Sequence, residues 1–244
     1  MKKLFYTIAI FLVLGLAGFL ILKSFQGIGN TEKEETTMNL QKPANPGDML
    51  QLPQPRTKGD VSLEEALTLR RSIRSYTQEP LSLMELSQLL WSAQGITNER
   101  GFRTAPSAGA TFPLEMYVVV NNVEGLDKGI YHYLPSSNEL SLVRLADVSA
   151  DLARAALSQS MLSEAGAVLV FGAIYERTTE RYGERGERYV LNEIGHASQN
   201  VHLQAAALDL GTVVIGAYRD EETEEILQLD PNVRVLYMMP VGNM

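Results

Sequence analysis

The densest group of chemically useful side chains in this sequence is the run Arg70-Arg71-Ser72-Ile73-Arg74. A guanidinium group binds a phosphate through two parallel N–H donors, and a serine hydroxyl adds one more donor. Arginines at the end of a helix also stabilise it by about 0.3–1 kcal/mol without any ligand, because they complement the helix dipole. The residues alone leave both interpretations open, but clustered arginines in a chain of net charge -8 favour an anionic partner.

Two further segments contain small residues that would let their backbone contact a ligand. Residues 104–110 are small and include one proline and one glycine, so their backbone can approach a flat ligand closely. The run Val214-Ile215-Gly216-Ala217-Tyr218 lies at the exit of an expected strand, where a glycine can leave a backbone N–H free to face a cofactor. An ordinary loop and an ordinary strand end explain the same residues, so neither segment decides the function by itself.

The sequence excludes several other kinds of site. It contains no cysteine, which excludes disulfides, thiolate catalysis and cysteine-ligated metals. His196 and His202 would face different sides of one helix and His132 lies in an expected strand, so we expect all three to be structural. No zinc motif, nucleophile elbow or phosphate-binding glycine loop occurs, so we expect no metal site and the sequence assigns no catalytic residue. The acidic net charge argues against nucleic-acid binding.

Hydrophobic periodicity predicts an α+β domain built around one apolar helix. Ser62-Leu63-Glu64-Glu65 and Ser82-Leu83-Met84-Glu85 both have the capping pattern that begins a helix. A long amphipathic helix is expected over Glu187–Leu210, with Gly211 ending it. Strands are expected at Met116–Val120, Ile130–Tyr133, Leu140–Val143, Ala167–Ile174, Thr212–Ala217 and Val233–Met239, with a helix at Val148–Leu157 and another capped by Asp220.

The N-terminal part of the chain predicts a membrane anchor and a linker. Leu4–Leu22 is uncharged and almost entirely apolar, and about 20 such residues span a bilayer. The apolar region of a cleaved signal peptide has only about 7–15 residues, so a single transmembrane helix within residues 1–25 is expected and a cleaved signal is the alternative. Residues 26–60 are rich in proline and charge, which predicts a disordered linker. The globular domain is expected over residues 61–244.

A series of motifs follows in an order that is typical of one family. The motifs are Arg70–Tyr76, Pro80-Leu81-Ser82, Leu89–Gly95, Arg103–Gly109, Pro113-Leu114-Glu115, Glu193-Ile194-Gly195-His196 with Gln199-Asn200, Leu210-Gly211, Ile215-Gly216 and Met239-Pro240-Val241-Gly242. Together they resemble the SagB-type dehydrogenase branch of the nitroreductase superfamily. The resemblance covers nearly all of residues 61–242.

This resemblance implies a homodimeric α+β sandwich of the nitroreductase type, with two FMN molecules at the subunit interface. Arg70, Arg71, Ser72 and Arg74 would hold the phosphate and ribityl chain of FMN. Pro106, Ser107, Ala108 and Gly109 would reach the flavin from the partner subunit. Ile215, Gly216 and Ala217 would place a backbone N–H near the flavin N5 atom, where it tunes the electronics of the ring.

The resemblance also implies an FMN-dependent oxidoreductase that exchanges hydride with a small organic substrate, such as a nitroaromatic compound or a quinone. Azoline-oxidising relatives use a Lys-Tyr pair as base. The counterpart here is Arg188-Tyr189, and arginine does not lose its proton. Oxidation of azoline rings in a peptide is therefore the alternative, and a catalytically silent flavin-fold binding protein is a third hypothesis. Tyr182, Tyr189 and Tyr218 are candidates for an aromatic side chain that stacks on the substrate.

The side of the membrane on which the domain lies determines the electron donor. Lysines flank the apolar run almost equally, so the charge rule does not decide the orientation. The short two-lysine start and the lack of cysteine favour a domain on the extracytoplasmic side. An extracytoplasmic domain would use a donor such as membrane quinol, whereas a cytoplasmic one would use NAD(P)H.

Overall fold

A seven-stranded antiparallel sheet forms the centre of the computed structural model, which describes residues 42–244. Its strand order is β1-β4-β3-β2-β5-β7-β6. The strands are β1 (Met49–Gln51), β2 (Leu114–Val120), β3 (Gly129–Leu134), β4 (Glu139–Leu145), β5 (Ala167–Ala173), β6 (Leu210–Thr212) and β7 (Arg234–Asn243). Because β5 is buried along its whole length, its continuous apolar sequence agrees with a central strand covered on both faces.

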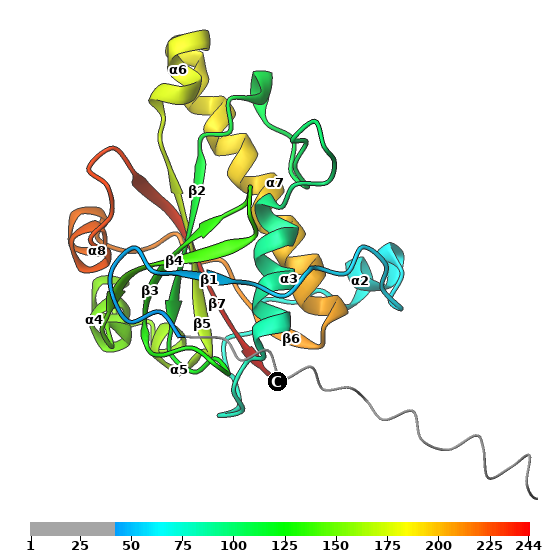
Figure 1. The fold of residues 1–244 in the computed structure, drawn as a ribbon, viewed down its shortest axis with the longest axis vertical. Helices are drawn as coiled ribbons and strands as arrows, with labels where there is room; N and C mark the ends of the chain where they lie inside the picture. The colour runs from blue at the N-terminus through cyan, green and yellow to red at the C-terminus, as the bar shows by residue number, and fades with distance from the viewer. Residues whose placement is uncertain (1–41) are drawn as a thin grey trace, which may run out of the picture. The chain divides into compact units, whose positions relative to one another are not determined.

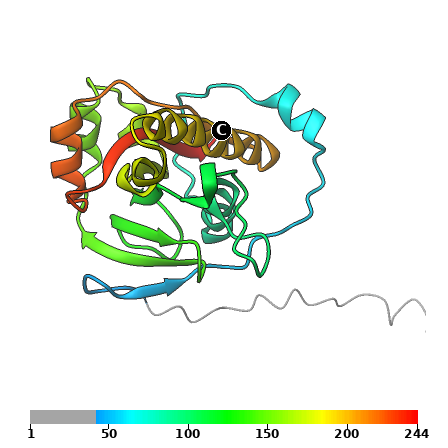
Figure 2. The same cartoon turned by 90° about the horizontal axis from the view of Figure 1, so that it is seen from above.

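Helices cover both faces of this sheet (Figures 1 and 2). They are α2 (Leu63–Leu69), α3 (Leu83–Gln94), α4 (Ser149–Ala155), α5 (Met161–Glu164), α6 (Glu176–Tyr182), α7 (Arg185–Ala207) and α8 (Asp220–Leu227), with a short 3-10 turn, η1, at Ala108–Ala110. Side chains of α3 and α7 pack with Leu169 and Phe171 of β5, whereas side chains of α4, α5 and α8 pack with Val168 and Val170. Alternate residues of one strand therefore belong to two cores, which gives the predicted α+β sandwich.

The capping signals read from the sequence operate at both helix starts. At α3, the Ser82 side chain accepts the Glu85 N–H and the Glu85 carboxylate accepts the Ser82 N–H, so the capping box is complete. At α2, the Ser62 hydroxyl accepts the Glu65 N–H. Both predictions of a helix start are confirmed.

The predicted end of the long helix was wrong by three residues. Helix α7 ends at Ala207, and Asp209 takes the left-handed conformation, with φ of 59°, that was expected of Gly211. Gly211 lies instead in β6, where a Cβ atom would come within 2.7 Å of the Ile73 side chain. The glycine at this position allows the segment that follows α2 to approach the sheet, rather than ending the helix.

The predicted linker over residues 26–60 was wrong for its described part. Met49–Gln51 forms strand β1, which pairs with β4, and Leu50 and Leu52 are buried in the core. The linker was predicted from the many prolines in this region. The short alternation of exposed and buried residues in Met49–Gln51 is nevertheless sufficient for an edge strand. The fold therefore includes residues on the N-terminal side of Val61.

The predicted membrane anchor within residues 1–25 and the linker up to residue 41 lie outside the described residues and stay predictions. Between residues 42 and 244, no helix is both long and apolar enough to cross a bilayer.

A chain that begins at residue 61 should be less stable than one that begins at residue 42. It loses two buried leucines, Leu50 and Leu52, each worth about 1.5–3 kcal/mol, so the free energy of unfolding should fall by about 3–6 kcal/mol. Urea denaturation followed by circular dichroism measures the difference. Equal midpoints for the two chains would show that β1 contributes nothing to the fold.

Candidate functional site

The arginine run begins where α2 ends and lies along the edge of the sheet. Arg70 caps the C-terminus of α2, and the chain then continues without regular structure. The Ile73 N–H donates to the Thr212 carbonyl of β6 at 3.0 Å, and the Thr77 N–H donates to the Asn243 carbonyl of β7 at 2.9 Å. The segment between these two bonds is therefore fixed against the edge of the sheet by its backbone.

The side chains of this run are available for a ligand. Arg71, Ser72 and Arg74 are exposed and Arg70 is half-buried. Arg71 donates to backbone carbonyls of its own helix end, while Arg70 and Arg74 form no side-chain hydrogen bond or ion pair with any other residue between 42 and 244. A cavity of about 270 Å³, lined by Arg71 and the buried His202 among others, opens beside the run.

The segment with Ile215, Gly216 and Ala217 lies close to the same edge. Ile215 and Met238 of β7 exchange two backbone hydrogen bonds, of 2.8 and 3.0 Å. Gly216 and Ala217 are exposed, and Ile215 follows only three residues after Thr212, which holds Ile73. The structure thus brings two of the three predicted segments to one end of β6, with Gly216 outside the sheet ladder.

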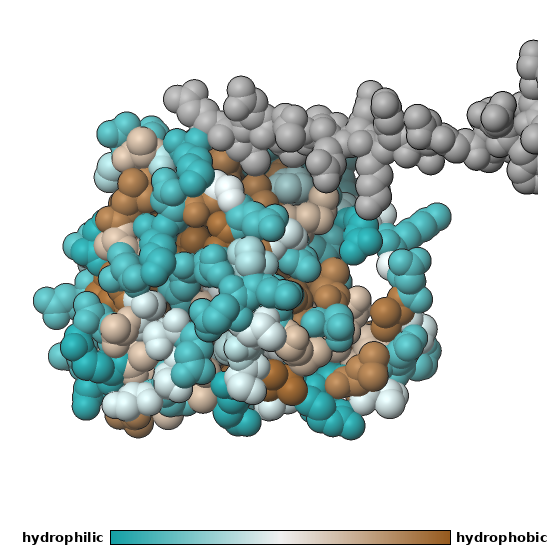
Figure 3. Space-filling model, turned by 90° about the horizontal axis from the view of Figure 1, so that it is seen from below, coloured by the Kyte–Doolittle hydropathy of each residue, from teal (hydrophilic) through white to brown (hydrophobic). Residues whose placement is uncertain are grey.

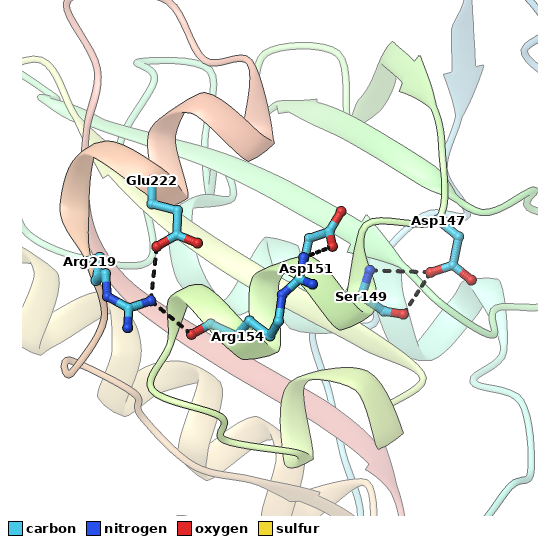
Figure 4. A network of polar contacts seen from close by, with 6 residues as sticks. All are labelled: Asp147, Ser149, Asp151, Arg154, Arg219 and Glu222. Carbon is cyan, nitrogen blue, oxygen red and sulfur yellow. Dashed lines mark hydrogen bonds and ion pairs between the residues drawn. The ribbon is translucent and has the colours of Figure 1, made fainter.

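Two contacts to the α4 region hold this segment in place. Arg219 donates to the Arg154 carbonyl and pairs with Glu222, as Figure 4 shows. Gln159 donates its side-chain amide to the Ala217 carbonyl at 2.9 Å, from a turn in which Leu157 and Ser158 both have positive φ. Sequence reasoning missed Gln159, because no local pattern signals a contact between residues so far apart in the chain.

The small-residue segment forms a tight loop at the other end of α7. Gly109, Ala110 and Phe112 have φ of 62°, 54° and 47°, so three of four consecutive residues are left-handed. Such a backbone persists only where its surroundings fix it. Helix α6 does so, because Arg181 donates to the Gly109 carbonyl and Arg177 donates to the Phe112 carbonyl.

The loop and the arginine run do not meet within the described chain. Thr104, at the start of the segment, accepts a hydrogen bond from Asn200, but Gly109 contacts α6 and Ser107 lies beside Glu193 in the first half of α7. The arginine run lies near His202, nine residues further along the same helix, which corresponds to about 13 Å of helix length. A single chain therefore keeps the two groups of predicted residues apart, an arrangement that fits the expectation that Pro106, Ser107, Ala108 and Gly109 reach a flavin in the partner subunit.

An unusual carboxyl group lies at the base of this loop. Glu193 is only 3% exposed, and burial raises its pKa to about 7 against the opposing effects of the Ser107 hydroxyl and Arg103. Arg103 lies 4.4 Å from the centre of the Phe112 ring and donates to the side-chain Oε1 atom of Gln94 at 2.6 Å. Sequence reasoning missed Glu193, although a charged residue beside Ile194 on the apolar face of an amphipathic helix was the available signal.

A second polar cluster ties α6 to the sheet. The Glu115 carboxylate lies 2.6 Å from both His132 Nε2 and an Arg177 nitrogen, and His132 stacks on Tyr117 at 4.5 Å. Burial opposes ionisation of Glu115, but His132 and Arg177 hold its pKa below the usual value. His132 is thus engaged structurally, as expected. Within residues 42–244, no group of three or more histidine, aspartate or glutamate side chains is placed to bind a metal ion.

Comparison with known proteins identifies the family. The sequence profile of the Nitroreductase family matches residues 67–243, which include all the predicted site residues. The chain belongs to this family. A nitroreductase-like protein of Methanocaldococcus jannaschii is 48% identical over 198 residues, which are 80% of this chain and 98% of that protein. The resemblance predicted from the motifs is therefore confirmed.

A solved structure and a more distant relative extend the comparison. The crystal structure of a nitroreductase-like protein from Ralstonia eutropha matches 84% of this chain and 93% of its own, with a TM-score of 0.71 and 29% identity. The microcin B17-processing protein McbC of Escherichia coli is 30% identical over 156 residues, which are 62% of this chain and 57% of McbC. The nitroreductase-like α+β fold is confirmed, and the peptide-processing branch is among the relatives.

Proposed function

We propose that this nitroreductase-family protein is an FMN-dependent oxidoreductase that exchanges hydride with a small electron-poor organic molecule, such as a nitroaromatic compound or a quinone. The observation that carries the proposal is the approach to one end of β6 of arginine side chains that have no acidic partner between residues 42 and 244 and of the exposed Gly216. The arginine side chains suit a phosphate and the exposed glycine backbone suits a flat ring, and FMN contains both a phosphate and a flat ring.

The residues present fit FMN chemically. Arg70 and Arg74 have no acidic partner between residues 42 and 244, so their guanidinium groups are available to a phosphate. Gly216 is exposed, and a Cβ atom built there would lie in ordinary van der Waals contact with the Tyr237 ring, at 3.5 Å. Bound FMN would supply the hydride chemistry, while the chain would hold the phosphate and orient the ring.

We further propose that the active form is a homodimer, in which the 106–109 loop of one subunit completes the site of the other. Leu63, Leu67 and Leu69 of the peripheral helix α2 are more than half exposed, as is Leu191 of α7. Other apolar side chains also reach the surface on the face seen in Figure 3. Such exposure is typical of a surface that a second subunit covers.

Light scattering tests the dimer. The described domain should have twice the mass of one chain at micromolar concentration, and Leu63→Glu with Leu67→Glu should shift it to a monomer because charge is disfavoured in a buried apolar interface. Met84→Glu, at another exposed apolar position, serves as the control. A monomer that binds FMN with full affinity would contradict the proposal.

The substrate side of the site is formed from α6 and α7. Tyr182 and Tyr189 contact each other edge to face at 5.1 Å, and Tyr182 borders Gly109 of the loop. We propose that these rings face a small substrate, with NAD(P)H or a quinol as electron donor. Likeness to McbC supports the alternative, oxidation of azoline rings in a peptide, but Arg188 beside Tyr189 is a poor proton acceptor.

The proposal predicts how FMN binding responds to substitution. Arg74→Ala should weaken FMN binding by about 1.5–3 kcal/mol, or about 10–150-fold, the scale of a hydrogen bond to a charged group. Riboflavin binding should change little, because riboflavin lacks the phosphate. Fluorescence titration of the apoprotein with each flavin gives both dissociation constants.

Arg100→Ala provides the matched control for this experiment, because Arg100 is exposed and lies in a different loop. Its affinity for FMN should equal that of the unmodified chain. If replacing Arg70, Arg71 and Arg74 together leaves FMN binding unchanged, the phosphate assignment fails.

A further inference from the structure

The left-handed turn at residues 109–112 closes the 106–109 loop and needs support from its surroundings. Gly109, Ala110 and Phe112 all have positive φ, a conformation that residues other than glycine keep only where other contacts fix it. Within the turn, the Ser107 hydroxyl accepts the Phe112 N–H at 2.9 Å. Bonds inside the turn do not set its place relative to the rest of the molecule, so contacts from other elements must do so.

Helix α6 provides donors for the carbonyl groups at both ends of this turn. Arg181 donates to the Gly109 carbonyl at 3.1 Å, and Arg177 donates to the Phe112 carbonyl at 3.0 Å. Both arginines lie on one short helix, four residues apart, so they lie one turn of the helix from each other. The position of the turn therefore follows the position of α6.

The position of α6, in its turn, depends on polar contacts. Of the residues in Glu176–Tyr182, only Thr178 is buried, and its hydroxyl lies 2.8 Å from the hydroxyl of Thr111 in the turn. A helix without an apolar face gains little from hydrophobic packing. A polar contact between α6 and the sheet is therefore needed to hold the helix in place.

Glu115 of β2 supplies this contact. One of its carboxylate oxygens lies 2.6 Å from a terminal nitrogen of Arg177, and the other lies 2.6 Å from Nε2 of His132. The His132 ring is stacked on Tyr117 of the sheet, with 4.5 Å between the ring centres. Although burial raises the pKa of Glu115, the hydrogen bond from His132 and the charge of Arg177 hold this pKa below its usual value, so the carboxylate is ionised at neutral pH.

The Arg177 guanidinium thus joins two elements. Its Nη2 atom pairs with Glu115 of the sheet, whereas its Nη1 atom donates to the Phe112 carbonyl of the turn. A guanidinium group is planar and holds its donors in fixed directions. When the carboxylate fixes one side of the group, the other side therefore presents its donor at a fixed point. A lysine ammonium would keep the charge but not this fixed fork.

We propose that Arg177, held by Glu115, is a positioning residue: its guanidinium fixes the turn at 109–112, and with it the 106–109 loop, to the central sheet. This inference rests on the proposed FMN site, because the proposed function assigns the loop to the flavin ring. It adds to that site two residues, outside the assigned flavin contacts, that set the affinity for the ring.

Amide hydrogen exchange in the apoprotein of the full chain tests the proposal. The N–H groups of Ala110, Thr111 and Phe112 are hydrogen-bonded within the turn and should be protected. Arg177→Ala should make these amides exchange at least about tenfold faster, the scale of a lost hydrogen bond to a charged group. Arg177→Lys should accelerate the same amides but lower the melting temperature less, because the lysine can still pair with Glu115.

Two further variants complete the exchange experiment. Glu115→Gln removes the charge that holds the guanidinium, so it should also accelerate exchange in the turn, and combining it with Arg177→Ala should add little because both act through one connection. Arg234→Ala is the matched control. Arg234 likewise joins a glutamate, Glu224 of α8, to a backbone carbonyl, that of Pro231, but contacts neither the turn nor α6 through these bonds. Its exchange in the turn should equal that of the unmodified chain.

Flavin titration connects this positioning role with the proposed site. The dissociation constants of Arg177→Lys for FMN and for riboflavin should both rise, by the same factor of up to about tenfold, because a smaller fraction of the protein presents the loop correctly. The two flavins share the ring to which the loop is assigned. Arg74→Ala, by contrast, should weaken the binding of FMN alone.

Two results would overturn the inference. Unchanged exchange of the turn amides in Arg177→Lys would show that the guanidinium does not fix the turn, and this variant decides the question if Arg177→Ala fails to fold. Equal acceleration of exchange throughout the chain would show a general stabilising role alone. The exchange measurement needs no flavin, so failure of the unmodified chain to bind FMN or riboflavin would refute the proposed function while the role of Arg177 in the turn is still decided.

Discussion

The backbone hydrogen bonds between the segment after α2 and the edge of the sheet are the interactions on which the candidate site depends. Ile73 bonds to Thr212 and Thr77 bonds to Asn243, so the arginine run is fixed against β6 and β7. Gly211 makes this close approach possible, because any side chain there would collide with Ile73. Without this pairing, Arg70 and Arg74 would lie on a free segment beyond a short helix, and no fixed relation to Gly216 would exist.

Helix α7 separates the two groups of site residues and links both to one core. Its first half meets the loop through Glu193, and its second half borders the arginine run through His202. Because a rigid helix keeps these ends apart, one chain presents the proposed phosphate-binding edge and the proposed ring-contacting loop in different places. A second subunit is the simplest way to unite them, and the exposed leucines of α2 and α7 provide a surface for it.

Sequence patterns predicted the elements whose residues bury a continuous apolar face. Strand β5, helix α3 and most of α7 followed from periodicity, and the motif order predicted the family. Strand β1 was missed because three residues between prolines carry too little signal, and α6 was missed because its segment is almost entirely polar. The predicted strand over Thr212–Ala217 is divided in the structure, with β6 ending at Thr212 and Ile215 forming a single bridge to Met238.

The candidate site was predictable only where its residues are close together in the sequence. Clustered arginines and small residues are visible along the chain, so the three segments could be proposed as parts of a site, and that assignment stays a prediction. Glu193 and Gln159 come close to segments that are distant in sequence, and only the fold reveals that Glu193 lies beside the 106–109 loop and that Gln159 donates to the Ala217 carbonyl. Such long-range support comes from tertiary packing, which no local pattern encodes.

Complementation between two inactive subunits tests most directly whether one site is built from two chains. One variant would replace Arg70, Arg71 and Arg74 with alanine, and the other would carry Ala108→Trp, which obstructs the loop. Each variant alone should bind no FMN, whereas a mixed dimer purified with two different tags should bind one, because it contains one site with both halves intact. A mixed dimer that binds no FMN, or an Ala108→Trp protein that binds it normally, would contradict the account.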